Sequence, residues 1–418
     1  MHQSQFKDFN VSASRYGPMK EVLGQGIFTT EGHAWKLNRG LLRPYFSKGH
    51  VLSIDKVEHH VDNLIAQIPK DASPVNFQKL AFDFTMDVIT EFLFGRSVNT
   101  LSSTDPALQK FADTLDSAED LMGQRARCGF FYPLVKTRSL KKKAKVIHEF
   151  VDSCIQDAAT ALAENNLAKN HDSKRDTTEN ATDNFPTQRE DVVSDLLTRT
   201  SDFKQIRDNL MALIIAGRDT SAASMSMFFY EVSRQPAIWD KLQQEVISNF
   251  GTENRPDVSE ARRLKYLRQV YDETLRMYPP LAWNPRVAVD DICLPTGGGP
   301  TGDEPLLVRK GTLVAFSAWA LHRDKETFGP DAETFVPERW DKLSGLDWSH
   351  FIPFGGGPRR CIGQEFALNV ATFTIVRLLQ KFSGVKNVDP TPFQEDLGIT
   401  LASEHGVHLA FTSREDRK

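Results

Sequence analysis

A single cysteine, Cys361, lies in the segment FGGGPRRCIG at residues 354–363, directly before a long segment with the apolar periodicity of a helix. A thiol at a helix N-terminus meets the positive end of the peptide dipoles, and Arg359 and Arg360 add positive charge, so the sequence predicts a thiolate. The glycines allow the backbone to approach a flat, bulky group closely. An iron ligand fits this context best, while a nucleophile with a distant base and an inert buried cysteine are the alternatives.

The segment LMALIIAGRDTSAASMSMFFY, residues 210–230, combines an apolar helical pattern with two adjacent charges, Arg218 and Asp219. A helix that is apolar on most faces is buried, and charges in its middle are costly unless they are paired or used. Gly217 costs about 1 kcal/mol relative to alanine inside a helix, so it needs a reason. One interpretation is a local opening of the helix, where a ligand lies over Gly217 and Thr220 offers its hydroxyl group. The other, which the segment alone favours, is a solvent-exposed Arg218–Asp219 pair on a core helix.

Two further pairs of side chains have the spacing of one helical face. Glu273 and Arg276 in YDETLRMYPP lie three residues apart, and Trp35 and Arg39 in GHAWKLNRG lie four apart. Arg339 in FVPERW offers a second cation to Glu273. A guanidinium group binds carboxylates in a bidentate way, so Arg39 beside an indole N–H is a candidate carboxylate-binding residue. The alternatives are an ordinary surface ion pair and an amphipathic surface helix.

The composition excludes several function classes. The 418 residues carry 51 basic and 55 acidic side chains, a net charge of −4, which gives no electrostatic basis for nucleic-acid binding. The four cysteines have no C-x-x-C spacing, which argues against a disulfide framework or a zinc site and favours a reducing compartment. No apolar run approaches the ~20 residues of a membrane span, and the N-terminus has no signal-peptide core. The residues alone therefore predict a soluble intracellular protein.

Helices dominate the expected structure, and strands are concentrated late in the chain. Apolar residues at spacings of three and four predict helices over 32–46, 76–94 and 203–234. Residues 164–190 have almost no apolar side chains and predict a flexible polar loop. Two β-hairpins are expected, at 306–316 and 397–411. We expect the polar loop to lie within one domain that spans residues 1–418, because the candidate site residues lie on both sides of it.

Together the four motifs resemble those of the cytochrome P-450 monooxygenases. FGGGPRRCIG fits the haem-loop pattern F-x-x-G-x-R-x-C-x-G, AGRDT at 216–220 resembles the oxygen-activating motif A/G-G-x-D/E-T, and ETLR and PERW resemble E-x-x-R and P-E-R-F. The motifs follow the family's order, and the resemblance runs from about Phe6 to the C-terminus. It implies a mainly α (α+β) haem-thiolate fold with small β-sheets. Within the family the chain resembles the fungal alkane and fatty-acid ω-hydroxylases.

This resemblance implies a role for each candidate residue. Cys361 would bind the iron of haem b as a thiolate, and Phe354 would pack against the sulfur side of the ring. Asp219 and Thr220 would deliver protons to dioxygen. The residues expected to hold the haem propionates are Trp35, Arg39, Arg286 and Arg359. A structural triad behind the cysteine loop would consist of Glu273, Arg276 and Arg339.

The resemblance also implies partners and a location. Electrons would come from NADPH through a separate NADPH–cytochrome reductase, and one atom of O2 would enter a C–H bond of a small lipophilic substrate such as a fatty acid, an alkane or a secondary-metabolite intermediate. Substrate contacts are expected from residues 6–28, 119–135, 281–287 and 400–403. The family implies the cytosolic face of the endoplasmic reticulum membrane.

The start of the chain departs from the family pattern. QFKDFN already resembles the region before the substrate-facing loop, so an N-terminal helix and strands are expected to be missing, and the remaining sheet would have an exposed edge. If this chain is the real product, a cytoplasmic location is expected. A catalytically silent truncated remnant that binds haem is the alternative to an active monooxygenase.

Overall fold

The computed structural model describes residues 5–46, 54–103, 105–172, 191–343 and 349–414. In this part of the chain the fold is mainly helical with small antiparallel sheets, which confirms the predicted class. The α-helices are α1 Ser12–Leu23, α2 Gly32–Leu42, α3 Ile54–Ala66, α4 Phe77–Phe94, α5 Pro106–Arg127, α6 Thr137–Asp172, α7 Val192–Arg199, α8 Phe203–Val232, α9 Pro236–Phe250, α10 Val258–Ala261, α11 Lys265–Met277, α12 Ala318–Leu321, α13 Lys325–Phe328 and α14 Gln364–Lys381. The 3₁₀-helices are η1 Phe6–Asp8, η2 Arg43–Phe46, η3 Gly129–Leu134, η4 Pro337–Asp341 and η5 Gly357–Arg359.

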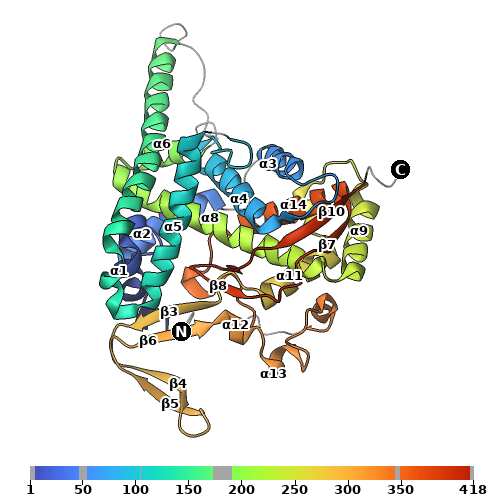
Figure 1. Ribbon diagram of the computed structural model, residues 1–418. Coiled ribbons are helices and arrows are strands. Elements are labelled where there is room, and N and C mark those ends of the chain that lie inside the picture. Colours follow the sequence, from blue (N-terminus) through green and yellow to red (C-terminus); the bar gives the residue numbers. More distant parts are fainter. Residues whose placement is uncertain (1–4, 47–53, 104, 173–190, 344–348, 415–418) are drawn as a thin grey trace, which may run out of the picture.

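The helix α8 runs across the middle of the molecule (Figure 1). Asp202 caps its N-terminus by accepting a hydrogen bond from the backbone N–H of Gln205, which satisfies one of the free donors of the first turn. Most of its side chains are buried, as expected for a helix that is apolar on most faces. The helix α4 packs along α8 and is itself mostly buried. The predicted helices at 76–94 and 203–234 are therefore confirmed, and they form the centre of the fold.

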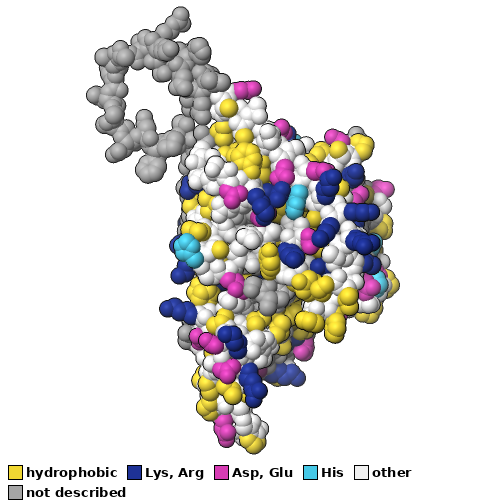
Figure 2. Space-filling model, turned by 90° about the vertical axis from the view of Figure 1, so that its left-hand side faces the viewer, with side chains coloured by type: hydrophobic (Ala, Val, Ile, Leu, Met, Phe, Trp, Pro, Cys, Tyr) yellow, Lys and Arg dark blue, Asp and Glu magenta, His cyan; other side chains and the backbone are white. Residues whose placement is uncertain are grey.

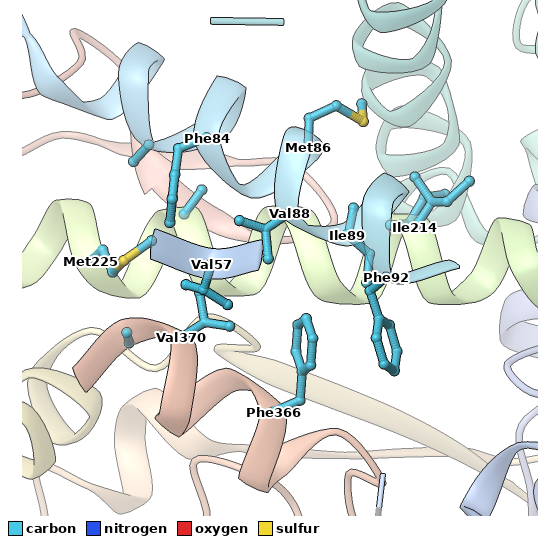
Figure 3. Close-up of a cluster of buried hydrophobic side chains, with 14 of the residues drawn as sticks. Val57, Phe84, Met86, Val88, Ile89, Phe92, Ile214, Met225, Phe366 and Val370 are labelled. Carbon is cyan, nitrogen blue, oxygen red and sulfur yellow. The ribbon is translucent and has the colours of Figure 1, made fainter. Parts of the chain in front are cut away.

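Aromatic side chains connect α4 to α14 beside the cysteine loop (Figure 3). Phe92 on α4 and Phe366 on α14 lie with ring centroids 4.9 Å apart. Phe46 of η2 packs edge-on against Phe366, with centroids 6.2 Å apart. Such ring pairs contribute about 0.5–1.5 kcal/mol beyond their buried area. They fix the first turn of α14, and thereby the segment directly before it, which contains Cys361.

The strands are short and form four small antiparallel sheets in the described ranges. Their bounds are β1 Phe9–Asn10, β2 Val75–Asn76, β3 Trp283–Ala288, β4 Ile292–Gly298, β5 Glu304–Val308, β6 Leu313–Ser317, β7 Phe382–Asn387, β8 Glu395–Leu397, β9 Leu401–Ser403 and β10 His408–Ser413. The strand orders are β1-β3-β6, β2-β10-β7, β4-β5 and β8-β9.

The pairing expected for the two hairpins is wrong, although the strand segments are correct. In 306–316, β5 pairs with β4 and β6 pairs with β3. The turn between β5 and β6 is held by Ala288 at the end of β3, which accepts a hydrogen bond from Gly311 N–H and donates one to the carbonyl of Thr312. In 397–411, β8 and β9 pair with one another, whereas β10 pairs with β2 and β7. Strand pairing depends on neighbours distant in sequence, which a local pattern does not contain.

The start of the predicted polar loop is also wrong. The helix α6 continues to Asp172, so residues 164–172 are helical, and residues 173–190 lie outside the described part of the chain. Adding residues to a helix that tertiary packing already stabilises requires no new nucleation, so a polar segment can continue the helix. Figure 1 shows this end of α6 projecting beyond the other helices.

Several large hydrophobic side chains are exposed on η3 and on the strands. Phe130 is 90 % exposed and Leu134 is 82 % exposed, and Phe131, Trp283 and Leu307 are also exposed. Figure 2 shows hydrophobic side chains gathered mainly in the lower half of the face that it presents. Exposed apolar groups that gather in this way mark interaction surfaces. None of the helices in the described ranges combines the length and the apolar character that crossing a membrane requires.

Gly217 lies where α8 packs against α4. A Cβ atom at this position would lie 2.5 Å from Cδ1 and 2.9 Å from Cγ1 of Ile89 on α4. The helix is continuous through Gly217, so the local opening, one of the two interpretations of this segment, is not observed. The glycine is explained by the close approach of two helices.

Replacing Gly217 with alanine is expected to lower the free energy of unfolding by about 1–3 kcal/mol, because the added methyl group overlaps Ile89. Gly40 on α2 is the matched control, since no atom lies within 4 Å of the Cβ that alanine would add there. Gly40→Ala should be stabilising by up to about 1 kcal/mol, as usual for glycine inside a helix. Urea unfolding measures both variants, and equal stabilities would contradict the packing explanation.

Candidate functional site

The loop that contains Cys361 is held by its own backbone and by His322. The Cys361 N–H donates to the carbonyl of Phe354 at 3.0 Å. The N–H of Ile352 donates to Nε2 of His322 at 2.9 Å. Gly355 and Gly357 have φ of 69° and 64°, a region that side chains disfavour. These positions explain the glycines of FGGGPRRCIG, because the loop turns sharply around the cysteine.

Burial raises the pKa of the Cys361 thiol. Cys361 is exposed as a residue, yet the protein around its thiol removes much of the hydration of that group. The Gly363 N–H, Arg39 and Arg360 act in the opposite direction. Burial thus opposes the predicted thiolate, which stays a prediction. Coordination by a metal deprotonates a thiol outright, so a bound iron would supply what the charges do not.

The helix α2 contributes Trp35 to the site, and the side chain of Asn38 connects this helix to α8. Asn38 on α2 accepts hydrogen bonds from Asn209 at 3.0 Å and from Gln205 at 3.2 Å, both on α8. Its own amide donates to the carbonyl of Gln25 at 2.9 Å. Trp35 is buried, and the guanidinium group of Arg359 lies over its ring at 4.5 Å from the centroid. Two segments far apart in the sequence thus meet at one tryptophan.

Four arginines from different elements form one cluster, in which Arg39 and Arg359 lie over the ring of this tryptophan. The predicted residues Arg39, Arg286 and Arg359 are brought together, and Arg15 on α1 joins them. Burial, followed by the charges of Arg286 and Arg359, lowers the pKa of Arg15 to about 9. Burial and Arg286 likewise lower the pKa of Arg359 to about 10, although Glu31 partly offsets this. The mutual repulsion shows that the cluster suits an anionic group.

The sequence patterns did not identify Arg15 as a member of this cluster. The guanidinium group of Arg15 donates to Oδ1 of Asn284 at 2.7 Å, and Arg286 donates to the same oxygen at 2.5 Å. The segment SASRYG around Arg15 belongs to no motif. Its position beside β3 depends on the packing of α1, so no local signal was available to find it.

On α8, Asp219 and Thr220 lie in contrasting environments. The Thr220 hydroxyl is partly buried and donates to the carbonyl of Ala216 at 2.7 Å. Asp219 is buried and lies 3.2 Å from Nη1 of Arg218. Burial raises the pKa of Asp219, and Arg218 opposes this effect. The interpretation of an exposed Arg218–Asp219 pair is wrong, because both side chains are buried and Arg218 is 3 % exposed.

The predicted triad is assembled in the protein interior. Glu273 is fully buried and accepts hydrogen bonds from Arg276 at 2.8 and 2.9 Å, from Arg339 at 3.4 Å and from the indole N–H of Trp340 at 3.1 Å. Arg276 also donates to the carbonyls of His322 and Ala332. The interpretation of Glu273 and Arg276 as a surface pair is therefore wrong. The triad ties α11 to residues 322–340, which precede the cysteine loop.

The segments expected to contact substrate come together. The helix α1 contacts β3, α5 and α8. On α5, a Cβ atom added to Gly123 would lie 3.3 Å from the carbonyl carbon of Gly398, in the turn between β8 and β9. The N–H of Leu401 donates to the carbonyl of Pro280 at 2.9 Å. These long-range contacts bring α1, α5, β3 and the β8–β9 turn together.

These features match those of a known protein family. The sequence profile of the family described as Cytochrome P450 matches residues 1–410. The chain belongs to the cytochrome P450 family. It is a cytochrome P450 monooxygenase, as the motifs predicted.

Several relatives of this cytochrome P450 are fungal proteins. Cytochrome P450 52A13 of Debaryomyces hansenii is 35 % identical over 98 % of this chain and 79 % of its own length. The cytochrome P450 monooxygenase himC of Aspergillus japonicus is 37 % identical over 97 % of this chain and 71 % of its own length. Cytochrome P450 52-E3 of Starmerella bombicola is 36 % identical over 98 % and 80 %, respectively. The chain is thus similar both to members of the P450 52 group and to other fungal P450 monooxygenases.

The described residues fit the haem that the P450 family binds. Cys361 offers a thiol on a loop that leaves open space at Gly355, where an added Cβ atom would meet no atom within 4 Å. Burial and the repulsion between neighbouring arginines lower the pKa of Arg15 and Arg359 below their ordinary values. The iron of a haem would bind the sulfur of Cys361, and the haem propionates would neutralise the arginines.

Proposed function

We propose that this cytochrome P450 inserts one oxygen atom from O2 into a C–H bond of a small lipophilic substrate, with electrons that come from NADPH through a separate NADPH–cytochrome reductase. The observation that carries the proposal is the meeting of the Cys361 thiol, its glycine-rich loop and the arginine cluster in one site. When bound, haem b would supply the activation of dioxygen. Members of the P450 family need a redox partner, and this supports the proposed role of a reductase.

The chain's own residues would bind the haem and manage protons. Cys361 would bind the iron, and Phe354, which packs against the main core, would support the ring on the sulfur side. Arg15, Arg39, Arg286 and Arg359, with the indole N–H of Trp35, would hold the propionates. Asp219 would hold a proton in its buried carboxyl group and pass it to the side of Thr220. The triad would keep the cysteine loop in place without contacting substrate.

We propose a fatty acid, an alkane or a secondary-metabolite intermediate as the substrate. Two observations support this class. The chain is about equally similar to a member of the P450 52 group and to the monooxygenase himC, at 35 % and 37 % identity. The segment η3, which lies within the range expected to contact substrate, has the mostly apolar sequence GFFYPL. The exposed Phe130 and Leu134 support a location at the cytosolic face of the endoplasmic reticulum membrane.

Purified protein with a reductase, NADPH and long-chain fatty acids tests this function. We expect an oxygenated product and substrate-dependent NADPH consumption. Absence of both at full haem loading, across fatty acids, alkanes and lipophilic intermediates, would support the catalytically silent alternative.

Thr220→Ala is expected to lower the rate of product formation by a factor on the order of 10², while NADPH oxidation continues, because a proton donor beside the reacting centre is lost. Ser226→Ala is a matched control on the same helix, since the Ser226 hydroxyl also donates to the carbonyl four residues earlier, at 2.7 Å. The ratio of product to NADPH consumed measures the effect. Full coupling in Thr220→Ala would show that the hydroxyl has no role in proton delivery.

A further inference from the structure

Four charged side chains meet where α5 crosses α8. The guanidinium group of Arg218 contacts three carboxylates, with Nη2 2.5 Å from Asp116 Oδ1, and Nη1 3.4 Å from Glu119 Oε2 and 3.2 Å from Asp219 Oδ1. The Phe82 ring lies below the guanidinium, 5.1 Å from its carbon. Glu119 and Asp219 are buried, whereas the Asp116 side chain is 54 % exposed. The cluster thus connects the protein surface to the residue that precedes Thr220.

The charges of this cluster do not balance if every carboxyl group is ionised. One guanidinium faces three carboxylates, and two of these, Glu119 and Asp219, contact the same nitrogen. Two carboxylates that share a desolvated site do not both ionise at neutral pH. Asp116 reaches solvent, so the missing proton belongs to the buried pair.

An unpaired buried oxygen of Glu119 indicates where this proton lies. Oε1 of Glu119 is buried and accepts no hydrogen bond from the described residues. Glu119 and Asp219 lie within hydrogen-bonding reach of one another, and two acceptors can form that bond only if one carries a proton. A proton on one of the two carboxyl groups would form this hydrogen bond.

The electrostatic surroundings favour Glu119 as the protonated partner. Burial, followed by the charge of Asp219, raises the pKa of Glu119 well above its usual value, and Arg218 only partly opposes this. From α4, Asp83 also faces the cluster, and Lys79 pairs with it at 2.7 Å. Asp116 raises the pKa of Glu119 further. No described neighbour other than Arg218 supplies a cation that would favour ionised Glu119.

We propose that Glu119 and Asp219 share one proton, and that Glu119 is a positioning residue that renews the proton of Asp219 during the reaction. The shared proton moves from Glu119 to Asp219, so the O–H bond of Glu119 breaks and an O–H bond forms on Asp219. Asp219 then gives this proton toward Thr220, which leaves both carboxyl groups ionised. Glu119 then takes a proton from solvent through the half-exposed Asp116. This inference rests on the proposed role of Asp219 in proton delivery.

The shared proton should change the way in which the free energy of unfolding depends on pH. This dependence can be measured without enzyme activity. A carboxyl group whose folded-state pKa lies above its unfolded value binds an extra proton in the folded protein, so stability falls as the pH rises between the two values. Above pH ~4.3, the unfolding constant of the wild-type protein should therefore rise relative to that of Glu119→Gln, by up to about tenfold per pH unit. Parallel pH profiles of the two proteins would overturn the proposal.

Asp113→Asn is the matched control for this measurement, because Asp113 is an exposed acid on the same helix. Its profile should follow that of the wild-type protein. A second measurement needs no variant: the infrared spectrum of the wild-type holoprotein should contain a carbonyl band of a protonated carboxyl group at neutral pH that shifts in D2O. Absence of that band would also overturn the proposal.

Coupling in the reconstituted enzyme separates this inference from the proposed function. Glu119→Gln should lower the product formed per NADPH several-fold and flatten its pH dependence, Asp219→Asn should do the same, and Asp113→Asn should change neither. If Asp219→Asn uncouples the enzyme while Glu119→Gln stays fully coupled with an unchanged pH profile, Glu119 does not renew the proton, and only the role of Asp219 remains. If both variants stay coupled, the role of Asp219 fails as well.

Discussion

Cys361→Ser is expected to abolish monooxygenase activity and to remove the strongly red-shifted absorption band that a thiolate-bound haem shows after reduction in carbon monoxide. The serine preserves the size and the backbone contacts of the loop, including the hydrogen bond from the N–H of residue 361 to the Phe354 carbonyl. An alcohol has a far higher pKa than a thiol and is a poor ligand for iron, so the electron-donating sulfur bond is lost.

The other cysteines provide the control for this experiment. Cys128 and Cys293 are both exposed and lie outside the loop. Cys128→Ser and Cys293→Ser should retain the band and the activity of the wild-type protein. A red-shifted band in Cys361→Ser would mean that another residue ligates the iron.

Glu273→Gln is expected to destabilise the protein by about 3–5 kcal/mol, because it leaves the buried guanidinium group of Arg276 without its counter-charge. The carboxylate of Glu273 accepts from Arg276, Arg339, Trp340 and the N–H of Val336, and its side chain has no exposed area. A neutral amide cannot accept from all these donors, since one of its two polar atoms is itself a donor. Urea unfolding of the haem-loaded protein measures the loss, and haem should dissociate at lower urea than in the wild-type protein.

Glu149 provides a matched comparison, because it forms an exposed ion pair with Lys145 at 3.7 Å on the surface of α6. Exposed pairs of this kind contribute about 0–1 kcal/mol, so Glu149→Gln should unfold almost like the wild-type protein. If Glu273→Gln cost no more than Glu149→Gln, the triad would not support the cysteine loop.

Local patterns were sufficient to predict the main helices and the chemistry of the site. The periodicity of 76–94 and 203–234 predicted α4 and α8 within a few residues of their observed ends. Capping by Asn76 and Asp202 uses side chains within three residues of their partners, so these ends are also encoded locally. Cys361 could be identified because its loop, its arginines and the following helix are contiguous in the sequence.

The predictions that failed depended on contacts between distant segments. The sequence pattern of 306–316 contains two strands and a turn, yet their partners β3 and β4 are specified by long-range pairing. The same limitation applies to Arg218, whose acid partners Asp116 and Glu119 lie about a hundred residues earlier in the chain.

By itself, then, the sequence determined that this protein is a mainly helical P450 with Cys361 as the candidate iron ligand, because periodicity, caps and motifs are local properties of the chain. Only the tertiary structure decided which charges meet. It placed Arg15 beside Arg286 and Arg359, buried Arg218 between α5 and α8, and raised the pKa of the Cys361 thiol through burial. Desolvation and charge–charge interactions depend on distance in space, and no pattern of neighbours along the chain contains that distance.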